Sequence, residues 1–166
     1  VVIPDSVTSI GSSVFNSCNY IESITIGNGV KTIGECAFYS SKSLKSIVIP
    51  DSVTTIGPRA FEGCTDVTTI TIGSSVTSIG YDAFNLNNSL ENVYCRATTP
   101  PTCELNRIIS SNNDVTLYVP YESLAAYVID PWYNYVTEPL FVNTPANNEI
   151  WYTTYNNKIV TPKDVF

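Results

Sequence analysis

Residues 49–64 read IPDSVTTIGPRAFEGC, and the apolar, glycine and phenylalanine positions of this stretch recur along the chain at a constant step of 23. Four copies keep this step without an insertion or a deletion. A fixed period of this length is the signature of a stacked repeat architecture. The recurring positions are Ile3, Ile26, Ile49 and Ile72; Val7, Val30, Val53 and Val76; Ile10, Ile33, Ile56 and Ile79; Gly11, Gly34, Gly57 and Gly80; and Phe15, Phe38, Phe61 and Phe84.

A single unit of this size is too small to bury its own apolar side chains. Stacking the units places equivalent side chains above one another, so each apolar position becomes a continuous internal column. We therefore predict that the four phenylalanines lie in file through the molecule, each contributing roughly 1.5–3 kcal/mol through burial.

The local pattern predicts one short strand and one short helical turn in each unit. The L-x-x-I-x-I segments end in β-branched residues that alternate with polar ones, which favours strands. Ile56, Ala60 and Cys64 recur at steps of four, which predicts a helical turn beginning near Gly57. The V-x-x-I segment between them could be extended or irregular. The predicted fold is an α/β repeat solenoid, a right-handed stack with parallel strands, convex helical turns and a C-terminal cap. The strand segments are residues 21–26, 44–49, 67–72 and 90–95.

The pattern resembles the BspA-like leucine-rich repeats of bacterial surface proteins, and the resemblance covers about residues 1 to 95. It departs mildly at Val14, which replaces the usual alanine, and at Ser41 and Asn87, which stand where Cys18 and Cys64 do. The resemblance implies a leucine-rich-repeat fold and a role in adhesion to a host or to other bacteria. It also implies that the protein is secreted or lies at the cell surface of a bacterium.

The repeat pattern ends after residue 95, and we predict three regions. Residues 1–95 form the array with an incomplete first copy, 96–137 a C-terminal cap, and 138–166 a linker with a hairpin. Residues 115–120 recover the strand pattern at a step of 24 beyond the fourth copy, which indicates a last strand with one inserted residue. Leu124, Tyr127 and Val128 then share one face of a short helix.

The tail predicts a β-hairpin in which residues 150–154 and 158–161 flank Asn156-Asn157. An isolated hairpin is marginal in water. We expect it to be either mobile or docked on a neighbouring repeat surface, and to lead to a missing downstream region. The chain opens without methionine, which suggests a fragment of a longer protein with further repeats before Val1.

Composition excludes several classes of function. With 8 basic against 15 acidic residues, the net charge of −7 argues against nucleic acid as a partner. The absence of histidine removes the commonest general base and metal ligand. The longest apolar run spans only residues 124–129, well below the ~18 of a membrane span. We therefore expect no enzyme activity, no cofactor, no metal and no membrane insertion by this segment.

The cysteines are interpreted mainly as small buried residues. Cys18 and Cys64 occupy one position two units apart, hence ~10 Å from each other, which is too far for a disulfide. Cys36 occupies a different position. Cys95 and Cys103 enclose the Pro100-Pro101 loop and could form a clip, which stays an open alternative. A cysteine nucleophile would have no histidine base.

The acidic residues suggest no catalytic pair. Asp5 and Asp51 follow proline in a turn, where aspartate commonly accepts hydrogen bonds from nearby backbone N–H groups. Glu22 and Glu91 are three units apart, too far for two carboxyl groups that must lie within ~10 Å.

The strands present an outward face that is polar and nearly uncharged. Simple solvation is one interpretation, and a docking surface for a host or bacterial protein is the other. We predict a non-catalytic protein-interaction and adhesion module, with Lys45, Thr69, Thr71, Glu91 and Tyr94 as the binding residues. The face consists of Glu22, Lys45, Thr68 and Glu91; Ser23, Ser46, Thr69 and Asn92; and Thr25, Val48, Thr71 and Tyr94.

Two alternatives remain. A carbohydrate-binding module would use the aromatic residues gathered in the cap, on which sugars could stack. A passive spacer would use the repeats only to hold another domain away from the cell envelope. The aromatic residues are Tyr118, Tyr121, Trp132, Tyr133 and Tyr135.

Overall fold

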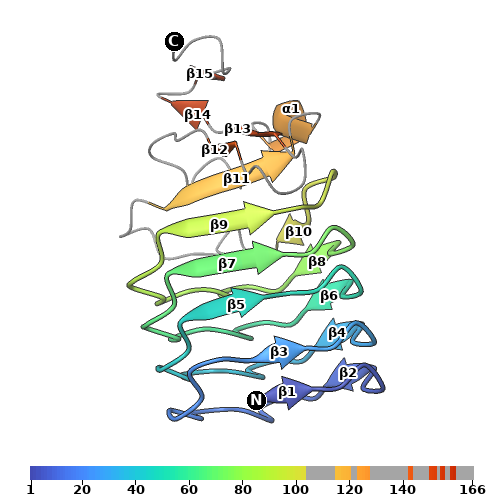
Figure 1. Ribbon diagram of the computed structural model, residues 1–166, viewed down its shortest axis with the longest axis vertical. Coiled ribbons are helices and arrows are strands. Elements are labelled where there is room, and N and C mark those ends of the chain that lie inside the picture. Colours follow the sequence, from blue (N-terminus) through green and yellow to red (C-terminus); the bar gives the residue numbers. More distant parts are fainter. Residues whose placement is uncertain are drawn as a thin grey trace.

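The computed structural model describes residues 1–103, 115–120 and 123–127, and the backbone of the strands at 142–143, 150–152, 154–155 and 158–159. The described chain is a parallel β-solenoid of about five turns, in which successive units of the repeat lie on top of one another (Figure 1). We number the turns coil 1 to coil 5 according to the strand that opens each of them, which is β1, β3, β5, β7 or β9.

The L-x-x-I-x-I segments form the strands that we call the front sheet. These strands run parallel and lie one above another in Figure 1, with β1 paired to β3 and β5, β7, β9 and β11 paired in series. The predicted strands are therefore confirmed, although each is shorter than its segment. Their bounds are β1 Val2–Ile3, β3 Thr25–Ile26, β5 Ser46–Val48, β7 Thr69–Ile72, β9 Asn92–Cys95 and β11 Thr116–Pro120.

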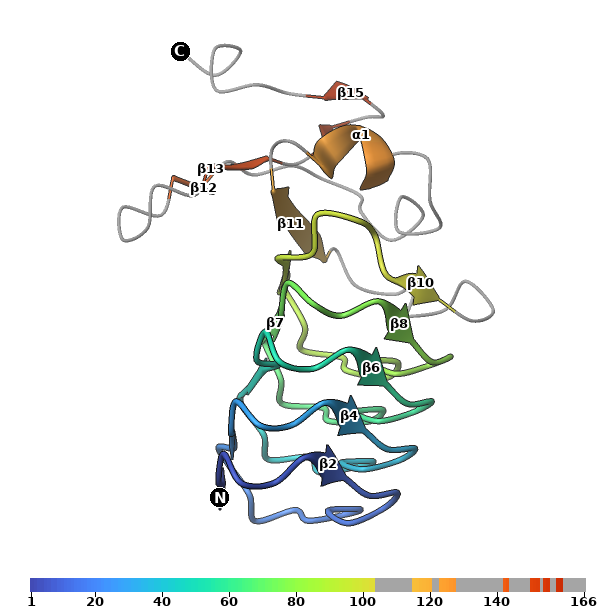
Figure 2. The ribbon, with the colours of Figure 1, turned by 90° about the vertical axis from the view of Figure 1, so that its right-hand side faces the viewer.

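The V-x-x-I segments, which the sequence left undecided, are extended and form a second sheet. Its strands are parallel, follow the order β10-β8-β6-β4-β2, and occupy the side of the solenoid that faces the viewer in Figure 2. The fold is therefore a β-solenoid with two sheets. The bounds are β2 Ser9–Ile10, β4 Thr32–Ile33, β6 Thr55–Ile56, β8 Ser78–Ile79 and β10 Thr102–Cys103.

The predicted helical turns, and with them the α/β class, are wrong. Residues 57–66 form turns, and no helix occurs within residues 1–103. The N–H groups of Arg59, Phe61 and Gly63 donate to carbonyls of the next coil at 2.9, 2.8 and 2.9 Å. An α-helix would instead direct each N–H to the carbonyl four residues earlier in its own chain. Because the adjacent coil supplies acceptors at every second residue, the segment bonds mainly between coils. Inside it, the Glu62 N–H donates to the Arg59 carbonyl at 3.2 Å, which closes a turn and not a helix.

Two positions in each of the first four units adopt a left-handed backbone conformation in this turn segment. Seven of these residues are not glycine and have φ between 53° and 59°, and the eighth is Gly63 at 74°. Each reversal of φ keeps alternate N–H groups aimed along the solenoid axis. The two columns are Ser13, Cys36, Arg59 and Asp82, and Ser17, Ser40, Gly63 and Leu86.

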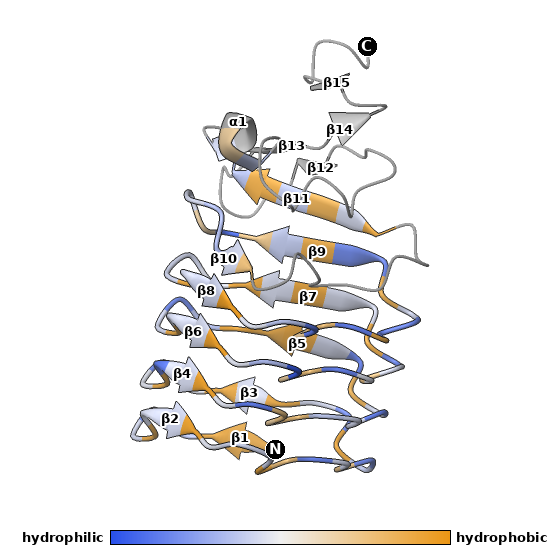
Figure 3. Cartoon of the chain, turned by 180° about the vertical axis from the view of Figure 1, so that it is seen from behind, coloured by the Kyte–Doolittle hydropathy of each residue, from blue (hydrophilic) through white to orange (hydrophobic). Residues whose placement is uncertain are grey.

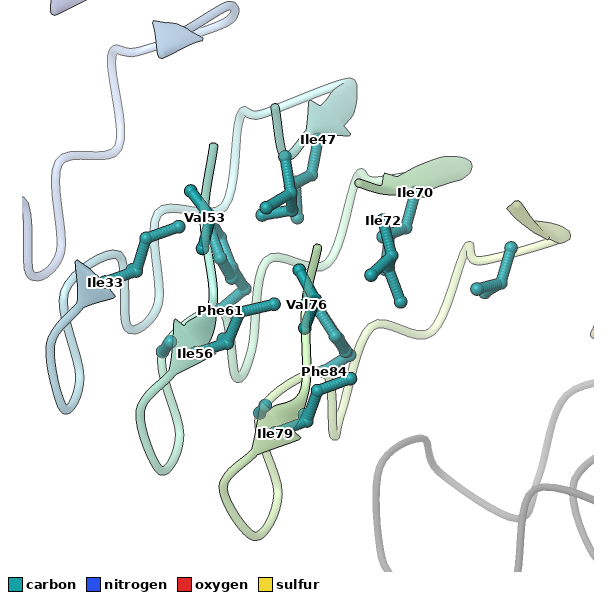
Figure 4. Packing of buried hydrophobic residues seen from close by; sticks show 14 of the residues in the cluster. Ile33, Ile47, Val53, Ile56, Phe61, Ile70, Ile72, Val76, Ile79 and Phe84 are labelled. Atoms are coloured by element: carbon teal, nitrogen blue, oxygen red, sulfur yellow. The ribbon is translucent and has the colours of Figure 1, made fainter. Parts of the chain in front are cut away.

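The core is a set of columns between the sheets, formed by the inward residues of strands whose hydropathy alternates (Figure 3). Phe15, Phe38, Phe61 and Phe84 stack face to face, with centroid separations of 5.0, 4.9 and 5.6 Å and interplanar angles of 6°, 4° and 12°. Figure 4 shows Phe61 beside Phe84, with isoleucine columns on either side. The predicted file of phenylalanines is confirmed, and its spacing follows from the ~4.8 Å distance between adjacent strands.

Proline and glycine alternate at the position that follows the front strand. Pro4 and Pro50 belong to coils 1 and 3, and Gly27 and Gly73 to coils 2 and 4. A Cβ on Gly27 would lie 2.6 Å from the carbonyl carbon of Pro4, and one on Gly73 would lie 2.4 Å from the carbonyl oxygen of Pro50. A coil placed on a proline-containing coil therefore needs glycine at this position.

Aspartate links the same pairs of coils. The Asn28 N–H donates to Asp5 Oδ1 at 2.6 Å, and the Ser74 N–H donates to Asp51 Oδ1 at 2.8 Å. The prediction that these carboxylates accept backbone N–H groups is confirmed, with the donors in the next coil. Coils 1 and 2, and coils 3 and 4, are thus joined in the same way.

The chain beyond coil 5 continues the front sheet. In the pairing of β11 with β9, Thr116 lies opposite Asn92, a step of 24 that agrees with one inserted residue. The short helix α1 (Leu124–Tyr127) follows. Strand β13 (Ile150–Tyr152) pairs antiparallel with β11 and with β12 (Val142–Asn143), while β14 (Thr154–Tyr155) and β15 (Lys158–Ile159) pair around residues 156–157. The hairpin thus overlaps the predicted segments only in part, because β14 includes Tyr155 and residues 150–152 pair with β11 and β12 instead. The division into three regions stays a prediction.

Candidate functional site

The outward residues of the front sheet form a continuous surface, which we call the front face. Strand register places Ser46, Thr69 and Asn92 in one row and Val48, Thr71 and Tyr94 in the next. Neither row contains a charged side chain. Val48 is 55% exposed, which leaves an apolar side chain open to solvent in the middle of this surface.

Three of the five predicted binding residues come together on this face. Thr71 and Tyr94 are direct partners across β7 and β9, and Thr69 lies two residues before Thr71 on the same side of its strand. All three are half-buried by their neighbours. They offer two threonine hydroxyl groups and the phenol ring of Tyr94 to a partner.

The other two predicted residues, Lys45 and Glu91, lie in the row just before the strands. Backbone hydrogen bonds through Thr68 connect them, because the Thr68 N–H donates to Lys45 and the Glu91 N–H donates to Thr68. They are therefore two coils apart. Lys45 Nζ forms an ion pair of 2.6 Å with Asp66, and both side chains are largely exposed. An exposed pair of this kind contributes about 0–1 kcal/mol, so Lys45 stays available to a partner.

Tyr118 extends the row of Tyr94 onto β11, a placement that was not foreseen from the sequence. The two rings stack with their centroids 4.5 Å apart and their planes 10° from parallel. The Tyr118 hydroxyl donates to Asn92 Oδ1 at 3.3 Å, and burial, followed by the neighbouring Tyr94, raises the pKa of Tyr118. The sequence could have predicted this placement, because the step of 24 between the two strands puts position 118 opposite position 94.

This stacking bears on the carbohydrate alternative. Sugars stack on the open face of an aromatic ring, but Tyr118 is only 4% exposed and Tyr94 covers one of its faces. Tyr118 is therefore no platform for a sugar. The other aromatic residues proposed for this role, Tyr121, Trp132, Tyr133 and Tyr135, lie outside the described residues.

A second cluster lies on the turn segment, where the sequence predicted no site. The Arg59 guanidinium lies 5.0 Å from the centre of the Tyr39 ring, and Arg59 Nε pairs with Glu62 Oε2 at 2.5 Å. The hydrogen bond and the charge of Glu62 raise the pKa of Arg59. The i,i+3 spacing of Arg59 and Glu62 could have predicted this ion pair from the sequence. Since Glu62 is largely buried and Arg59 neutralises it, the cluster stabilises the turn.

The cysteines are arranged for packing. All five lie among the described residues as thiols, and none of them is joined in a disulfide. Burial raises the pKa of Cys64 to about 12 and that of Cys95 to about 11, so both are protonated thiols near neutral pH. Cys95 Sγ lies 3.1 Å from the Tyr127 hydroxyl, while Cys103 Sγ donates to the Pro101 carbonyl at 3.3 Å. The clip between Cys95 and Cys103 is not formed.

In the described part of the chain, no three potential ligands gather to hold a metal ion.

A family model described as the BspA type leucine-rich repeat region, with six copies, matches residues 1–100. The chain belongs to this family. The match confirms the resemblance inferred from the spacing of isoleucine, glycine and phenylalanine. In this BspA-type array, each of the first four units contributes a front strand, a strand of the second sheet and a turn with two left-handed residues.

Solved structures of bacterial proteins have a similar fold. A leucine-rich repeat protein of T. pallidum aligns with a TM-score of 0.56 at 28% identity, covering 68% of this chain and 56% of that protein. A leucine-rich repeat protein of Bacteroides ovatus aligns with a TM-score of 0.52 at 27% identity, covering 72% of this chain and 41% of that one.

The pneumococcal vaccine antigen PcpA aligns with a TM-score of 0.64 at 21% identity, covering 77% of this chain and 32% of its own, which shows a common fold. This BspA-type chain therefore spans between about a third and just over half of the length of the solved proteins it matches. No curated protein matches it. Among the described residues, no helix has the length and apolar character needed to cross a membrane.

Proposed function

We propose that this chain is a non-catalytic interaction module of a secreted or surface-attached bacterial protein, and that its front face binds another protein. BspA-type repeats generally serve as scaffolds for interaction or adhesion. The proposed contact residues are Lys45, Thr69, Thr71, Glu91 and Tyr94, to which the structure adds Val48 as an exposed apolar neighbour.

The observation that carries the proposal is the composition of the front face between β5 and β9. It combines an exposed apolar side chain, an aromatic ring and hydroxyl groups, and its two central rows contain no charge. The core of a protein–protein interface is likewise poor in charged residues and rich in aromatic ones. A rigid ladder of strands also holds these side chains in place before binding, which lowers the entropic cost of association.

The second sheet presents a different surface. Its outward row, Ser9, Thr32, Thr55, Ser78 and Thr102, bears only hydroxyl groups. In the adjacent row, the hydroxyls of Thr54 and Thr77 donate to backbone carbonyls of the preceding coil at 3.2 Å. This surface offers no apolar or aromatic contact, so it supplies a matched control for the front face.

The test compares equal changes on the two surfaces. Partners captured by the complete extracellular part of the protein are identified, and their affinities for purified variants are measured. We expect Thr69→Lys with Thr71→Lys to weaken binding by at least about tenfold, since two long charged side chains would enter the contact. Adding Tyr94→Ala should weaken it further. The control, Thr32→Lys with Thr55→Lys on the second sheet, should leave the affinity within about twofold.

An unchanged affinity in the front-face variants would contradict the proposal. A loss that appears only in the second-sheet control would move the binding site to that sheet. Failure to capture any protein would favour the spacer, and binding to an array of glycans would favour the carbohydrate module.

A further inference from the structure

The front sheet is interrupted at one junction. The pairs β1–β3, β5–β7, β7–β9 and β9–β11 form parallel ladders, but β3 and β5 form none, although the structure describes every residue from 1 to 103. The second sheet is continuous across the same junction, where Thr32 pairs with Thr55 and Ile33 with Ile56. Between coils 2 and 3, a strand ladder therefore exists in the second sheet only, while their turn segments are joined by backbone hydrogen bonds such as the one from the Phe38 N–H to the Ala60 carbonyl at 2.7 Å.

Proline explains part of this interruption. At the junction of coils 4 and 5, the Arg96 N–H donates to the Ile72 carbonyl at 2.9 Å. The residue equivalent to Arg96 at the junction of coils 2 and 3 is Pro50, which has no N–H and leaves this ladder bond unmade. The remaining links between the two coils lie elsewhere. The Lys45 N–H bonds to Glu22 before the strand, and the Gly57 N–H bonds to Ile33 after the second sheet. In the turn segment, the N–H groups of Cys36, Phe38 and Ser40 donate to carbonyls of coil 3 at 3.0, 2.7 and 2.7 Å.

We propose that this junction is a hinge at which the front strands of coils 2 and 3 separate and close while the second sheet and the turn segments hold the coils together. The motion changes the curvature of the front face between the pair β1–β3 and the strands from β5 onward. It is a property of the fold and stands whether or not the front face binds a protein. The second sheet, with its bond from Gly57 to Ile33, and the turn segment, with its bond from Phe38 to Ala60, form the fixed part of the junction.

Amide hydrogen exchange of the wild-type chain, resolved by residue, tests the hinge directly. The Ile49 N–H donates to Thr71 in β7, so the N–H of its neighbour Val48 points toward β3. Tyr94 occupies the equivalent position in β9 and faces β7. We expect the Val48 amide to exchange roughly tenfold faster than the Tyr94 amide, the ratio that one net hydrogen bond gives.

Reciprocal substitutions test the role of proline. Pro50→Arg restores an N–H at a site where Arg96 shows that arginine fits above a glycine-containing coil, and it should bring the Val48 rate toward that of Tyr94. Arg96→Pro should create a second hinge and raise the Tyr94 rate by roughly tenfold. Arg96→Ala is the matched control, because it removes the ion pair with Asp51 (3.5 Å) but keeps the N–H.

Equal exchange of the Val48 and Tyr94 amides in the wild type would overturn the proposal. So would an Arg96→Ala variant whose Tyr94 amide exchanges as fast as in Arg96→Pro, because the ion pair would then be responsible. Should Pro50→Arg fail to fold, the wild-type ratio and the two Arg96 variants still decide between the outcomes.

Discussion

Single residues in the turn segment carry backbone strain. A residue with a Cβ costs roughly 1–2 kcal/mol in the left-handed region, and seven such residues occur there within the array. Neighbouring coils stabilise them, because the alternate N–H groups of this segment bond from one coil to the next. The strain is therefore offset by the stacking itself.

Replacing one of these residues with glycine should stabilise the fold. We expect Leu86→Gly to raise the free energy of unfolding by about 1 kcal/mol, since Leu86 has φ of 57° and its side chain is half exposed. Urea denaturation measures the change. The converse substitution, Gly63→Ala at φ 74°, should lower the free energy by about 1 kcal/mol, and an increase there would contradict the argument.

The buried thiol of Cys64 predicts a loss of stability at alkaline pH. Burial raises its pKa from 9.0 to about 12, so the folded chain keeps the proton while the unfolded chain loses it. Its contribution is fully present below pH 9 and disappears as pH rises from 9 toward 12.

Between pH 7.5 and 10, wild type should lose about 1 kcal/mol more stability than Cys64→Ser, whose hydroxyl does not titrate there. Serine fits this position, because Ser41 donates to the Phe15 carbonyl at 2.7 Å just as Cys64 donates to Phe38. Chemical denaturation at the two pH values measures the difference. Parallel pH profiles for the two proteins would show that Cys64 does not titrate differently on unfolding.

At the scale of the element, the glycine before each turn segment sets how closely coils approach. A Cβ on Gly57 would lie 2.7 Å from the Glu35 nitrogen, whereas the nearest described atom to a Cβ on Gly11 is the flexible Val14 side chain at 3.3 Å. We expect Gly57→Ala to destabilise the fold by roughly 1–3 kcal/mol and Gly11→Ala by much less. Thermal unfolding of the two variants tests this. An equal loss of stability in both would mean that the backbone conformation of glycine matters at this position, and not the close contact between coils.

The elements also show what the sequence could predict. The alternation in the L-x-x-I-x-I segments identified the front strands, because side-chain period two is a local property of a strand. The spacing of Ile56, Ala60 and Cys64 suggested a helix, because spacing cannot reveal that the next coil accepts the N–H bonds of Arg59 and Phe61. Partners one full repeat away along the chain decided the conformation of this segment.

The candidate site was predictable to a similar degree. Strand alternation placed Thr69, Thr71 and Tyr94 on one face, which the register confirms. Their role in binding stays a prediction. The sequence pattern assigned Tyr118 to the cap, although the step of 24 between the two strands already placed it opposite Tyr94. The burial of Tyr118 depends on contacts with other strands, which a local sequence pattern cannot predict.

The whole molecule depends on the phenylalanine file. Phe61 is fully buried between Phe38 and Phe84, whereas Phe15, the first of the file, is half-buried. Phe61→Ala should lower the free energy of unfolding by about 3–5 kcal/mol, and Phe15→Ala should cost clearly less. Equilibrium denaturation of both variants provides the measurement. A similar cost at both positions would mean that the file does not act as a series of neighbour contacts.

The alternation of proline and glycine restricts how a gene for such an array can change its copy number. Recombination that adds or removes two whole coils keeps every proline-containing coil beneath a glycine-containing one. Loss of the block for a single coil between Pro4 and Pro50 would set one proline upon another, where even a Cβ on Gly27 meets backbone at 2.6 Å. Length variants of such an array should therefore lack directly stacked proline-containing coils at this position.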